Sequence, residues 1–311
     1  MVGGKDFQKK MTIKTRPVAK VLDGKLCAAL IRARLQNEIS LMKRKPKLVV
    51  IIVGDNPASK IYVRNKAKYA AEVGIESEVV ALPEDVSEKK LLSVIKKLNK
   101  NKKVNGILVQ LPLPKHIDEF TVINAIASEK DVDGFTIENK GLLSIGRPRL
   151  LPCTPLGIIT LLRYYKVGIK GKNVVVIGRS NIVGKPVAQL FTMLDATVTL
   201  CHSQTKNLAE VASGADILVS AVGKPNLVKG SFIKLGAVVV DVAMNRNADN
   251  TGWVGDAVRR DVEKKASYFT PVPGGVGPMT IAMLLQNTLA AYKIQQGDEQ
   301  SVENFLMERE G

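Results

Sequence analysis

The residue types best suited to proton chemistry occur together in the segment from Ser59 to Lys66. Tyr62 and Lys66 are four residues apart, so on a helix their side chains share one face and can touch. A lysine that is partly desolvated beside a phenol and near other cations is suited to proton transfer at neutral pH. The same spacing also fits an ordinary charged helix face from which the lysine extends into solvent. Spacing alone leaves both interpretations open.

Two more polar side chains stand where a ligand could reach them. Gln110 follows the apolar run 106–109, so its amide either points into a crevice or is an ordinary polar group of a loop. Asp133 precedes Gly134, a residue that lets the chain turn, and can present its carboxylate to a ligand. Asp131 can instead cap or pair locally. The spacing does not decide between these roles for the two aspartates.

A glycine turn after an apolar strand is a second kind of candidate site. Residues 174–177 predict a strand buried on both faces, and Gly178 allows a sharp turn. A helical pattern begins at Gly184, and the positive end of such a helix favours an anion such as a phosphate. The ordinary dinucleotide fingerprint would need further glycines, where this chain has Ser180 and Val183. The turn therefore fits either a phosphate site or a plain strand-turn-helix unit.

The elements that must position Tyr62, Lys66 and Gln110 alternate between helices and strands. Helical spacing runs from Leu22 to about Met42, with apolar residues that include Leu26 and Leu30. Strands are predicted at 48–53, 75–82 and 106–109, and helices at 58–73 and 87–98. This order predicts a parallel sheet with right-handed crossovers, whose ligands bind beyond the carboxyl ends of the strands. The segments 54–59 and 110–114 lie at those ends.

The second half of the chain predicts a Rossmann-like sheet. Thr154 and Pro155 are expected to open a helix, and strands are predicted at 174–177, 196–200, 216–219 and 237–240. An NAD-selective site usually has an acidic residue at the end of the second strand, and this chain has none there. Ser203, with Arg179 and Lys206 available, suits a ribose phosphate instead. NADP is therefore favoured over NAD.

The segment 270–280 is rich in glycine and proline and precedes an apolar helix from Ile281 to about Tyr292. Such a loop can be tight and fixed, with a backbone that approaches a flat ligand closely. It can also be a linker between domains. Because the last helix needs an apolar partner, we expect it to pack back on the first domain.

Composition restricts the class of protein. The chain of 311 residues predicts about two domains, and it is 45% hydrophobic without a run of about 18 apolar residues, so no membrane span is expected. The three cysteines are far apart, which excludes a disulfide framework and fits a reducing, cytoplasmic compartment. With two histidines, a histidine-based metal site is not expected. The first ~15 residues lack the features of a signal peptide and predict a flexible extension.

The formal net charge of +17 attracts polyanions of several kinds. The basic residues lie beside polar helix positions and lack the interleaved aromatic residues that stack on bases. We therefore expect a solvated basic face and no specific nucleic-acid partner. A basic nucleic-acid-binding α/β protein is the non-enzymatic alternative.

Six motifs occur in order along the chain: Tyr62-Val63-x-x-Lys66, Val109-Gln110-Leu111-Pro112-Leu113-Pro114, Lys130-Asp131-Val132-Asp133-Gly134, Pro152-Cys153-Thr154-Pro155, Gly178-Arg179-Ser180-x-x-Val183-Gly184-x-Pro186, and Pro271-Val272-Pro273-Gly274-Gly275-Val276-Gly277-Pro278-Met279-Thr280. Together they resemble the methylenetetrahydrofolate dehydrogenase/cyclohydrolase family over about residues 20 to 293. The resemblance implies a bifunctional enzyme of one-carbon metabolism, usually a homodimer, with its site in a cleft between two domains. A hydride would pass from 5,10-methylenetetrahydrofolate to NADP+, and water would then open the methenyl product to 10-formyltetrahydrofolate.

The resemblance also implies roles for individual residues. Lys66 would be the acid-base group of the hydrolysis, Tyr62 would position substrate and lysine, Gln110 would tune Lys66, and Asp133 would hold the pterin edge. The implied folate site comprises Ser59, Tyr62, Gln110, Leu111, Pro112, Asp133, Gly274, Gly275, Gly277, Pro278 and Thr280. The implied cofactor site comprises Gly178, Arg179, Ser180, Val183, Gly184, Pro186, Ser203, Val222, Gly223 and Asn245. The folate could carry a polyglutamate tail that the basic surface attracts.

The implied architecture is an α/β protein with two domains. Residues 1–18 would be the extension, 19–150 together with the C-terminal helix 277–293 the catalytic folate domain, 151–276 the Rossmann-like NADP-binding domain, and 294–311 a tail. Two positions depart from the family pattern: Ala243 stands where a glycine is usual, and Gln204 where a basic residue is frequent. These departures leave open a cyclohydrolase with little dehydrogenase activity.

Overall fold

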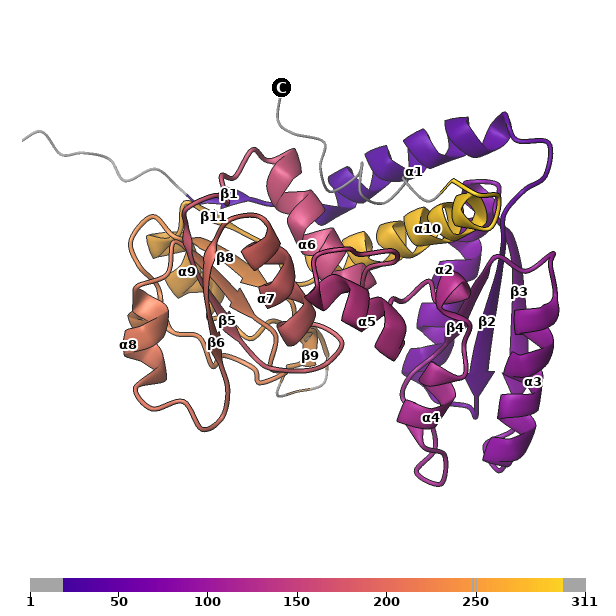
Figure 1. Ribbon diagram of the computed structural model, residues 1–311. Helices are drawn as coiled ribbons and strands as arrows, with labels where there is room; N and C mark the ends of the chain where they lie inside the picture. The colour runs from indigo at the N-terminus through magenta and orange to yellow at the C-terminus, as the bar shows by residue number, and fades with distance from the viewer. Residues whose placement is uncertain (1–18, 248, 250, 299–311) are drawn as a thin grey trace, which may run out of the picture.

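The chain forms two α/β lobes connected by long helices, as the computed structural model in Figure 1 shows. The structure describes residues 19–247, 249 and 251–298. The predicted extension 1–18 and residues 299–311 of the predicted tail lie outside the described residues. The predicted α/β class with two lobes is confirmed.

The first lobe is built on a parallel sheet of three strands in the order β3-β2-β4. Its strands are β2 (Lys47–Val53), β3 (Glu76–Leu82) and β4 (Gly106–Val109), and its helices are α1 (Gly24–Ser40), α2 (Pro57–Glu72), α3 (Glu88–Lys100), α4 (Glu119–Asn124) and α5 (Ile137–Ser144), with a 3-10 turn η1 (Ser128–Lys130). Strand β2 is apolar on both faces because helices cover both. Leu48 and Val50 pack in the core that includes α1, whereas Val49 and Ile51 pack in the core that includes α3.

The second lobe contains six parallel strands in the order β1-β11-β8-β7-β5-β6. These are β1 (Lys20–Val21), β5 (Asn173–Ile177), β6 (Thr197–Cys201), β7 (Ile217–Ser220), β8 (Val238–Asp241) and β11 (Tyr268–Phe269). A separate hairpin consists of β9 (Asn245–Arg246) and β10 (Trp253–Val254). The helical elements are α7 (Gly184–Met193), α8 (Leu208–Ser213), η2 (Gly230–Phe232) and α9 (Arg259–Lys265). The four predicted strands are present, each within about one residue of its predicted limits.

Strand β1 joins the second sheet although it precedes the whole first lobe in the sequence. Lys20 pairs with Tyr268 and Val21 with Phe269 at the sheet edge. The predicted first domain began at residue 19, yet these two residues add a strand to the other lobe. A two-residue strand has too short a pattern for sequence periodicity to reveal it.

Two apolar helices, α6 (Cys153–Tyr164) and α10 (Val276–Ile294), join the lobes. Helix α10 packs along both α1 and α6, and Figure 1 shows it running beside α1 above the sheet of the first lobe. One hydrophobic core therefore continues from β2 through α10 and α6 to β5. The prediction that the last helix packs on the first domain holds, and the same helix also contacts the helix that opens the second lobe.

One local prediction was wrong, and one apolar pattern does not coincide with the buried face of its helix. Helix α1 forms as expected, but Leu26 and Leu30 are each 49% exposed, and the buried face contains Cys27, Ala28 and Ile31 instead. Helix α6 begins at Cys153 after Pro152, without a side-chain cap from Thr154. The Thr154 hydroxyl lies 2.9 Å from that of Thr280 and so links the start of α6 to α10. Among the described residues, none of the helices has the length and apolar character that a membrane crossing requires.

Asn287 connects the two halves of the chain from the middle of α10. Its side chain is 1% exposed, and its amide nitrogen donates to the carbonyl oxygens of Val132 and Leu151 at 2.8 Å each. Val132 precedes Asp133, and Leu151 precedes α6. The contact therefore fixes the segment that leaves the first lobe against the segment that enters the second.

We expect Asn287→Leu to lower the free energy of unfolding by about 2–4 kcal/mol, because the buried Leu151 carbonyl loses its donor and the Val132 carbonyl retains the weak Cys153 thiol donor at 3.2 Å. Urea unfolding followed by circular dichroism measures this change. Thr288→Val is the matched control, since the Thr288 hydroxyl donates only to Leu284 within the same helix, and its loss should cost less than about 1 kcal/mol. Equal losses in the two variants would contradict the bridging role of Asn287.

Candidate active site

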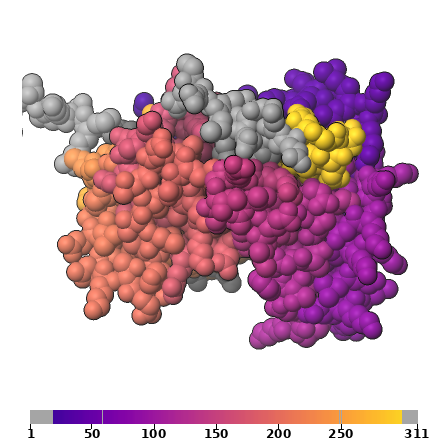
Figure 2. Space-filling view, viewed as in Figure 1, coloured from indigo at the N-terminus to yellow at the C-terminus, as the bar shows by residue number. Residues whose placement is uncertain are grey.

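A cleft of about 620 Å³ lies between the two lobes. In Figure 2 a notch at the lower edge separates the magenta surface of the first lobe from the orange surface of the second. The predicted residues that line the cleft are Ser59, Tyr62, Lys66, Gln110, Leu111, Pro112, Asp133, Ser180, Val183, Gly223, Gly277 and Thr280. Those that do not are Gly178, Arg179, Gly184, Pro186, Ser203, Val222, Asn245, Gly274, Gly275 and Pro278. The structure thus brings residues of both predicted sites to one cavity.

Lys66 is turned inward, and its nearest polar partner is Gln110. The ammonium donates to the Gln110 side-chain oxygen at 3.0 Å, and Lys66 is only 9% exposed. The Gln110 amide nitrogen donates to the Leu111 carbonyl at 2.7 Å, which fixes the oxygen toward the lysine. The alternative in which Lys66 extends into solvent is therefore wrong. Gln110 faces the cleft because it directly follows β4, at the carboxyl end of the first sheet.

Tyr62 reaches across the cleft from the first lobe to the second. The residue lies one helical turn before Lys66 on α2 and is 41% exposed. Its hydroxyl lies 3.7 Å from the sulfur of Met244, which belongs to the segment between β8 and β9. A thioether is a weak acceptor, so this contact leaves the phenol available to a stronger partner.

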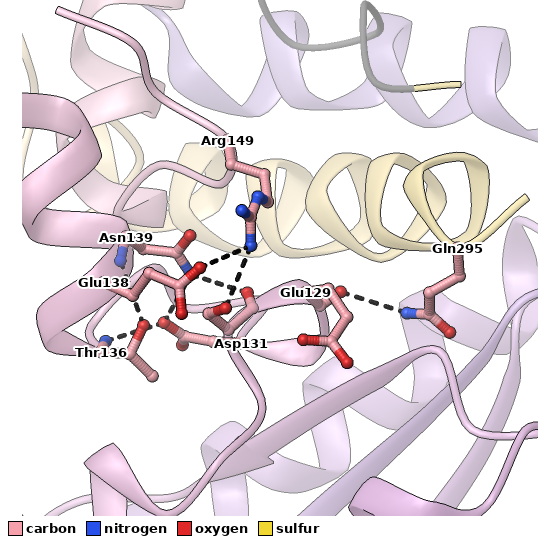
Figure 3. Close-up of polar contacts among 8 residues, drawn as sticks. Glu129, Asp131, Thr136, Glu138, Asn139, Arg149 and Gln295 are labelled. Carbon is pink, nitrogen blue, oxygen red and sulfur yellow. Dashed lines mark hydrogen bonds and ion pairs between the residues drawn. The ribbon is translucent and has the colours of Figure 1, made fainter. Parts of the chain in front are cut away.

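In the turn 130–134, Lys130 and Asp131 are held by hydrogen bonds within the protein, whereas Asp133 faces the cleft. Lys130 is 4% exposed, and its ammonium donates to three carbonyl oxygens at the end of α3, those of Leu98, Asn99 and Asn101. Asp131 accepts from the backbone of Thr136 and from the amide of Asn139 (Figure 3). Figure 3 also shows Arg149 paired with Glu138 and Gln295 donating to the Glu129 carbonyl beside this network. Asp131 therefore pairs locally beside Thr136, the N-cap residue of α5, and Asp133 is the aspartate that lines the cleft.

Burial and neighbouring charges act on Asp133 in opposite directions. Desolvation raises the pKa of its carboxyl group, and Asp131 nearby raises it further. The positive charge of Lys66 and a hydrogen bond from the Cys153 thiol lower the same pKa. Burial is the largest of these effects, so the carboxyl group holds its proton to a higher pH than an exposed aspartate does.

The glycine turn after β5 has the tight geometry that the sequence predicts. Gly178 has φ +113°, and a Cβ there would lie 2.4 Å from the carbonyl oxygen of Ala221. A Cβ at Gly184 would lie 1.9 Å from the Gly178 carbonyl oxygen, so both positions require glycine. The Ser180 hydroxyl accepts from the backbone of Val183 and of Gly184. Ser180 therefore occupies two of the helix donors that were expected to face a phosphate.

The ends of β5 and β6 are adjacent, because Ile177 pairs with Cys201. Arg179 and Ser203 each lie two residues after the end of one of these strands, and both are exposed. A guanidinium group and a hydroxyl at adjacent strand ends, with Lys206 in the same loop as Ser203, form a set of donors suited to a phosphate. Gln204, which replaces a basic residue, is also exposed in this loop.

The loop between β11 and α10 is held rigidly against the start of α1. The backbone N–H groups of Gly24 and Lys25 donate to the Gly274 carbonyl at 3.0 and 3.2 Å. The N–H of Gly275 donates to the Pro271 carbonyl at 2.8 Å. The loop is therefore a fixed wall, and Gly277 and Thr280, in the first turns of α10 that follow it, line the cleft.

Three residues of functional interest escaped the sequence reasoning. Met244 and Phe135 line the cleft, and Asp256 is a fully buried carboxylate behind it. Met244 lies next to the noted position Ala243, which also lines the cleft. Asp256 follows Gly255, and Asp133 precedes Gly134. An acidic residue beside a glycine is therefore the local signal that could have identified Asp256. In the part of the chain that the structure describes, no cluster of three His, Cys, Asp or Glu side chains could hold a metal ion.

Comparison with known proteins places these observations in a family. Residues 22–133 match the model of the tetrahydrofolate dehydrogenase/cyclohydrolase catalytic domain, and residues 152–296 match that of its NAD(P)-binding domain. The chain is 54% identical over 280 residues to the bifunctional protein FolD of Acetivibrio thermocellus, covering 89% of this chain and 98% of that protein.

Solved structures agree with this assignment. The bifunctional FolD enzyme of Campylobacter jejuni superimposes with a TM-score of 0.87 at 46% identity, covering 89% of this chain and 99% of that one. The Trypanosoma brucei enzyme, complexed with NADP cofactor and inhibitor, gives 0.86 at 43% identity over 89% and 98% of the two chains. This chain belongs to the tetrahydrofolate dehydrogenase/cyclohydrolase family.

Proposed function

We propose that this protein oxidises 5,10-methylenetetrahydrofolate with NADP+ and then hydrolyses the methenyl product to 10-formyltetrahydrofolate. The observation that supports this proposal most directly is the hydrogen bond between buried Lys66 and half-buried Gln110, which both line the cleft between the lobes. A single cavity lined by both lobes lets one bound folate serve both reactions without release.

Lys66 is proposed as the acid-base group of the hydrolysis. Water adds to the methenyl carbon, the carbon–nitrogen bond of the ring breaks, and one proton is released overall. A group that moves protons must stand near the nitrogen and the water, and Lys66 is the buried amine of the described cleft lining. Gln110 orients that amine through its side-chain oxygen, and Tyr62 lies one helical turn before it on α2.

The folate is proposed to bind along the first lobe. Asp133 would accept hydrogen bonds from the pterin edge, since its carboxylate faces the cleft and has few protein partners. Ser59, Leu111, Pro112, Gly277 and Thr280 line this side of the cleft. Gly274 and Gly275 of the rigid loop and Pro278 at the start of α10 lie next to it in the chain. Their fixed positions reduce the entropy lost on binding.

The residues of the second lobe fit NADP. The tight turn at Gly178 would let a cofactor approach the backbone closely. Arg179 and Ser203 suit the ribose phosphate of NADP. The other proposed cofactor-site residues come from the turn and loops around Gly178 and from the starts of α7 and β9: Ser180, Val183, Gly184, Pro186, Val222, Gly223 and Asn245. When bound, NADP+ accepts the hydride. NAD+ lacks the phosphate that Arg179 would bind, so it should serve less well.

We further propose a homodimer that works in the cytoplasm. The support is the membership of the family and the three free, buried cysteines, Cys27, Cys153 and Cys201, which fit a reducing compartment. The basic surface would attract the polyglutamate tail of cellular folates.

Lys66→Met should abolish hydrolysis of methenyltetrahydrofolate and should reduce NADPH formation less, because hydride transfer needs no proton donor. The two activities are followed by absorbance of the methenyl compound and of NADPH. Lys68→Met is the control, since Lys68 is exposed on the same helix and lies outside the lining of the cleft. Retained hydrolysis in Lys66→Met would remove this lysine from the mechanism.

The pH dependence of folate binding should report the charge of Asp133. Because Lys66 lowers the pKa of this carboxyl group, Lys66→Met removes that effect and raises the pKa further above its ordinary value. Binding that requires the carboxylate should then weaken at a higher pH in the variant than in the wild type. Calorimetric titration with tetrahydrofolate between pH 5 and pH 9 measures this loss of affinity at low pH in both proteins. Asp133→Asn should abolish the pH dependence, and superimposable wild-type and Lys66→Met profiles would argue against the coupling of Lys66 to Asp133.

Salt should separate folates by the length of their tails. If the basic surface attracts polyglutamate, added salt should raise the KM of a polyglutamylated substrate more than that of the monoglutamate. Steady-state assays from low to about 0.5 M KCl test this. Equal effects on the two substrates would reject the attraction.

A further inference from the structure

Asp256 is a buried carboxylate for which the proposed chemistry has no use. Its side chain is 0% exposed, and among the described residues it accepts four hydrogen bonds. One oxygen accepts from the Ser220 hydroxyl and the Val222 N–H, both at 2.9 Å. The other accepts from the Lys224 N–H at 2.9 Å and the Asn245 amide at 3.0 Å. These donors come from two separate segments, the loop after β7 and the start of β9.

The two segments form the wall of the cleft on the side of the second lobe. Ala221 and Gly223 line the cleft from the first segment, and Val242, Ala243 and Met244 line it just before Asn245. Asp256 itself is not part of the cleft lining, and it supports this wall through its four hydrogen bonds. One carboxylate therefore fixes the spacing between the two halves of the wall.

Asp256 is held in place by the end of β8. Its N–H donates to Asp241 at 3.0 Å, and the N–H of Ala257 donates to the other oxygen of Asp241 at 2.8 Å. A Cβ at Gly255 would lie 1.9 Å from Asp241, so position 255 requires glycine. The carboxylate thus stands on a rigid support, as a group that positions other residues must.

We propose that Asp256 is a positioning residue for the oxidation step, setting the cofactor-side wall of the cleft without contact to the reacting atoms; this rests on the proposed function. The groups assigned to hydrolysis, Lys66, Gln110 and Asp133, lie on the first lobe and make no described contact with Asp256. The described contact that links Tyr62 to this wall is the weak one with the Met244 sulfur. Loss of the carboxylate should therefore affect oxidation more than hydrolysis.

Asp256→Asn tests the role, because an amide has nearly the same shape but places an N–H₂ group against donors. We expect the KM for NADP+ to rise about tenfold or more, while hydrolysis of methenyltetrahydrofolate without NADP+ stays within about twofold of wild type. The matched control is Asp261→Asn. Asp261 also holds a loop, accepting from the Gly230 N–H at 2.8 Å, but it lies outside the cleft lining. It should change neither activity.

Several outcomes would overturn the role. An unchanged KM for NADP+ in folded Asp256→Asn does so, and so does a parallel fall of both activities. Where Asp256→Asn fails to fold, Ser220→Ala removes one of the four donors, and it should raise the same KM by a smaller factor with hydrolysis preserved. An unchanged KM there also overturns the proposal.

Calorimetric titration with NADP+ alone separates this proposal from the proposed function. Tighter binding to wild type than to Asp256→Asn, by about tenfold, supports the role of Asp256 even where wild type forms no NADPH. In that case the proposed oxidation fails and the positioning of the wall stands. Equal binding of NADP+ to the two proteins, together with normal NADPH formation by wild type, overturns the role of Asp256 and leaves the proposed oxidation in place.

Discussion

The carboxyl ends of two parallel sheets have to face one cleft, and every proposed role depends on this constraint. Gln110 follows β4 of the first sheet, and Gly178 follows β5 of the second. Helix α10 enforces the arrangement because it packs on α1 and on α6 at once, within a continuous hydrophobic core. A core shared by two lobes resists their separation, since opening them exposes apolar surface at a cost of about 25 cal/mol per Å². The distance between Lys66 and the wall of the second lobe is set mainly by this packing.

Polar contacts fix the orientation of the turn that presents Asp133, whereas the hydrophobic core fixes the distance between the lobes. The Asn287 amide joins Val132 to Leu151, so the turn that presents Asp133 cannot shift relative to the start of α6. Gly134 has φ +67°, and a Cβ there would lie 2.6 Å from the backbone of Leu151. These contacts act on the backbone, and they aim the Asp133 carboxylate without occupying it.

The sequence predicted regular elements well because their signal is local. Apolar strands such as β2 and β5 and the glycine at position 178 were recognisable from residue type and spacing. The candidate residues Tyr62, Lys66, Gln110 and Asp133 were found, but their meaning depended on distant contacts. Whether Lys66 faces solvent or Gln110 depends on a partner that lies 44 positions further along the chain. The exposure of Leu26 and Leu30 also depends on distant contacts, because the elements that pack on α1 determine which of its faces is buried.

The number of partners that a buried acid has separates structural carboxylates from reactive ones. Asp131 and Asp256 are as buried as any core residue. One oxygen of Asp131 accepts two hydrogen bonds from the protein, and the two oxygens of Asp256 accept four. Such carboxylates are held by hydrogen bonds within the protein, and a ligand could bind them only by breaking those hydrogen bonds. Asp133 has the Cys153 thiol and a nearby cation, and it borders the cleft. A carboxylate whose acceptor positions remain open at a cavity wall is the one that can receive a substrate. This distinction is invisible in the sequence Lys130-Asp131-Val132-Asp133, where the two acids differ only by one place.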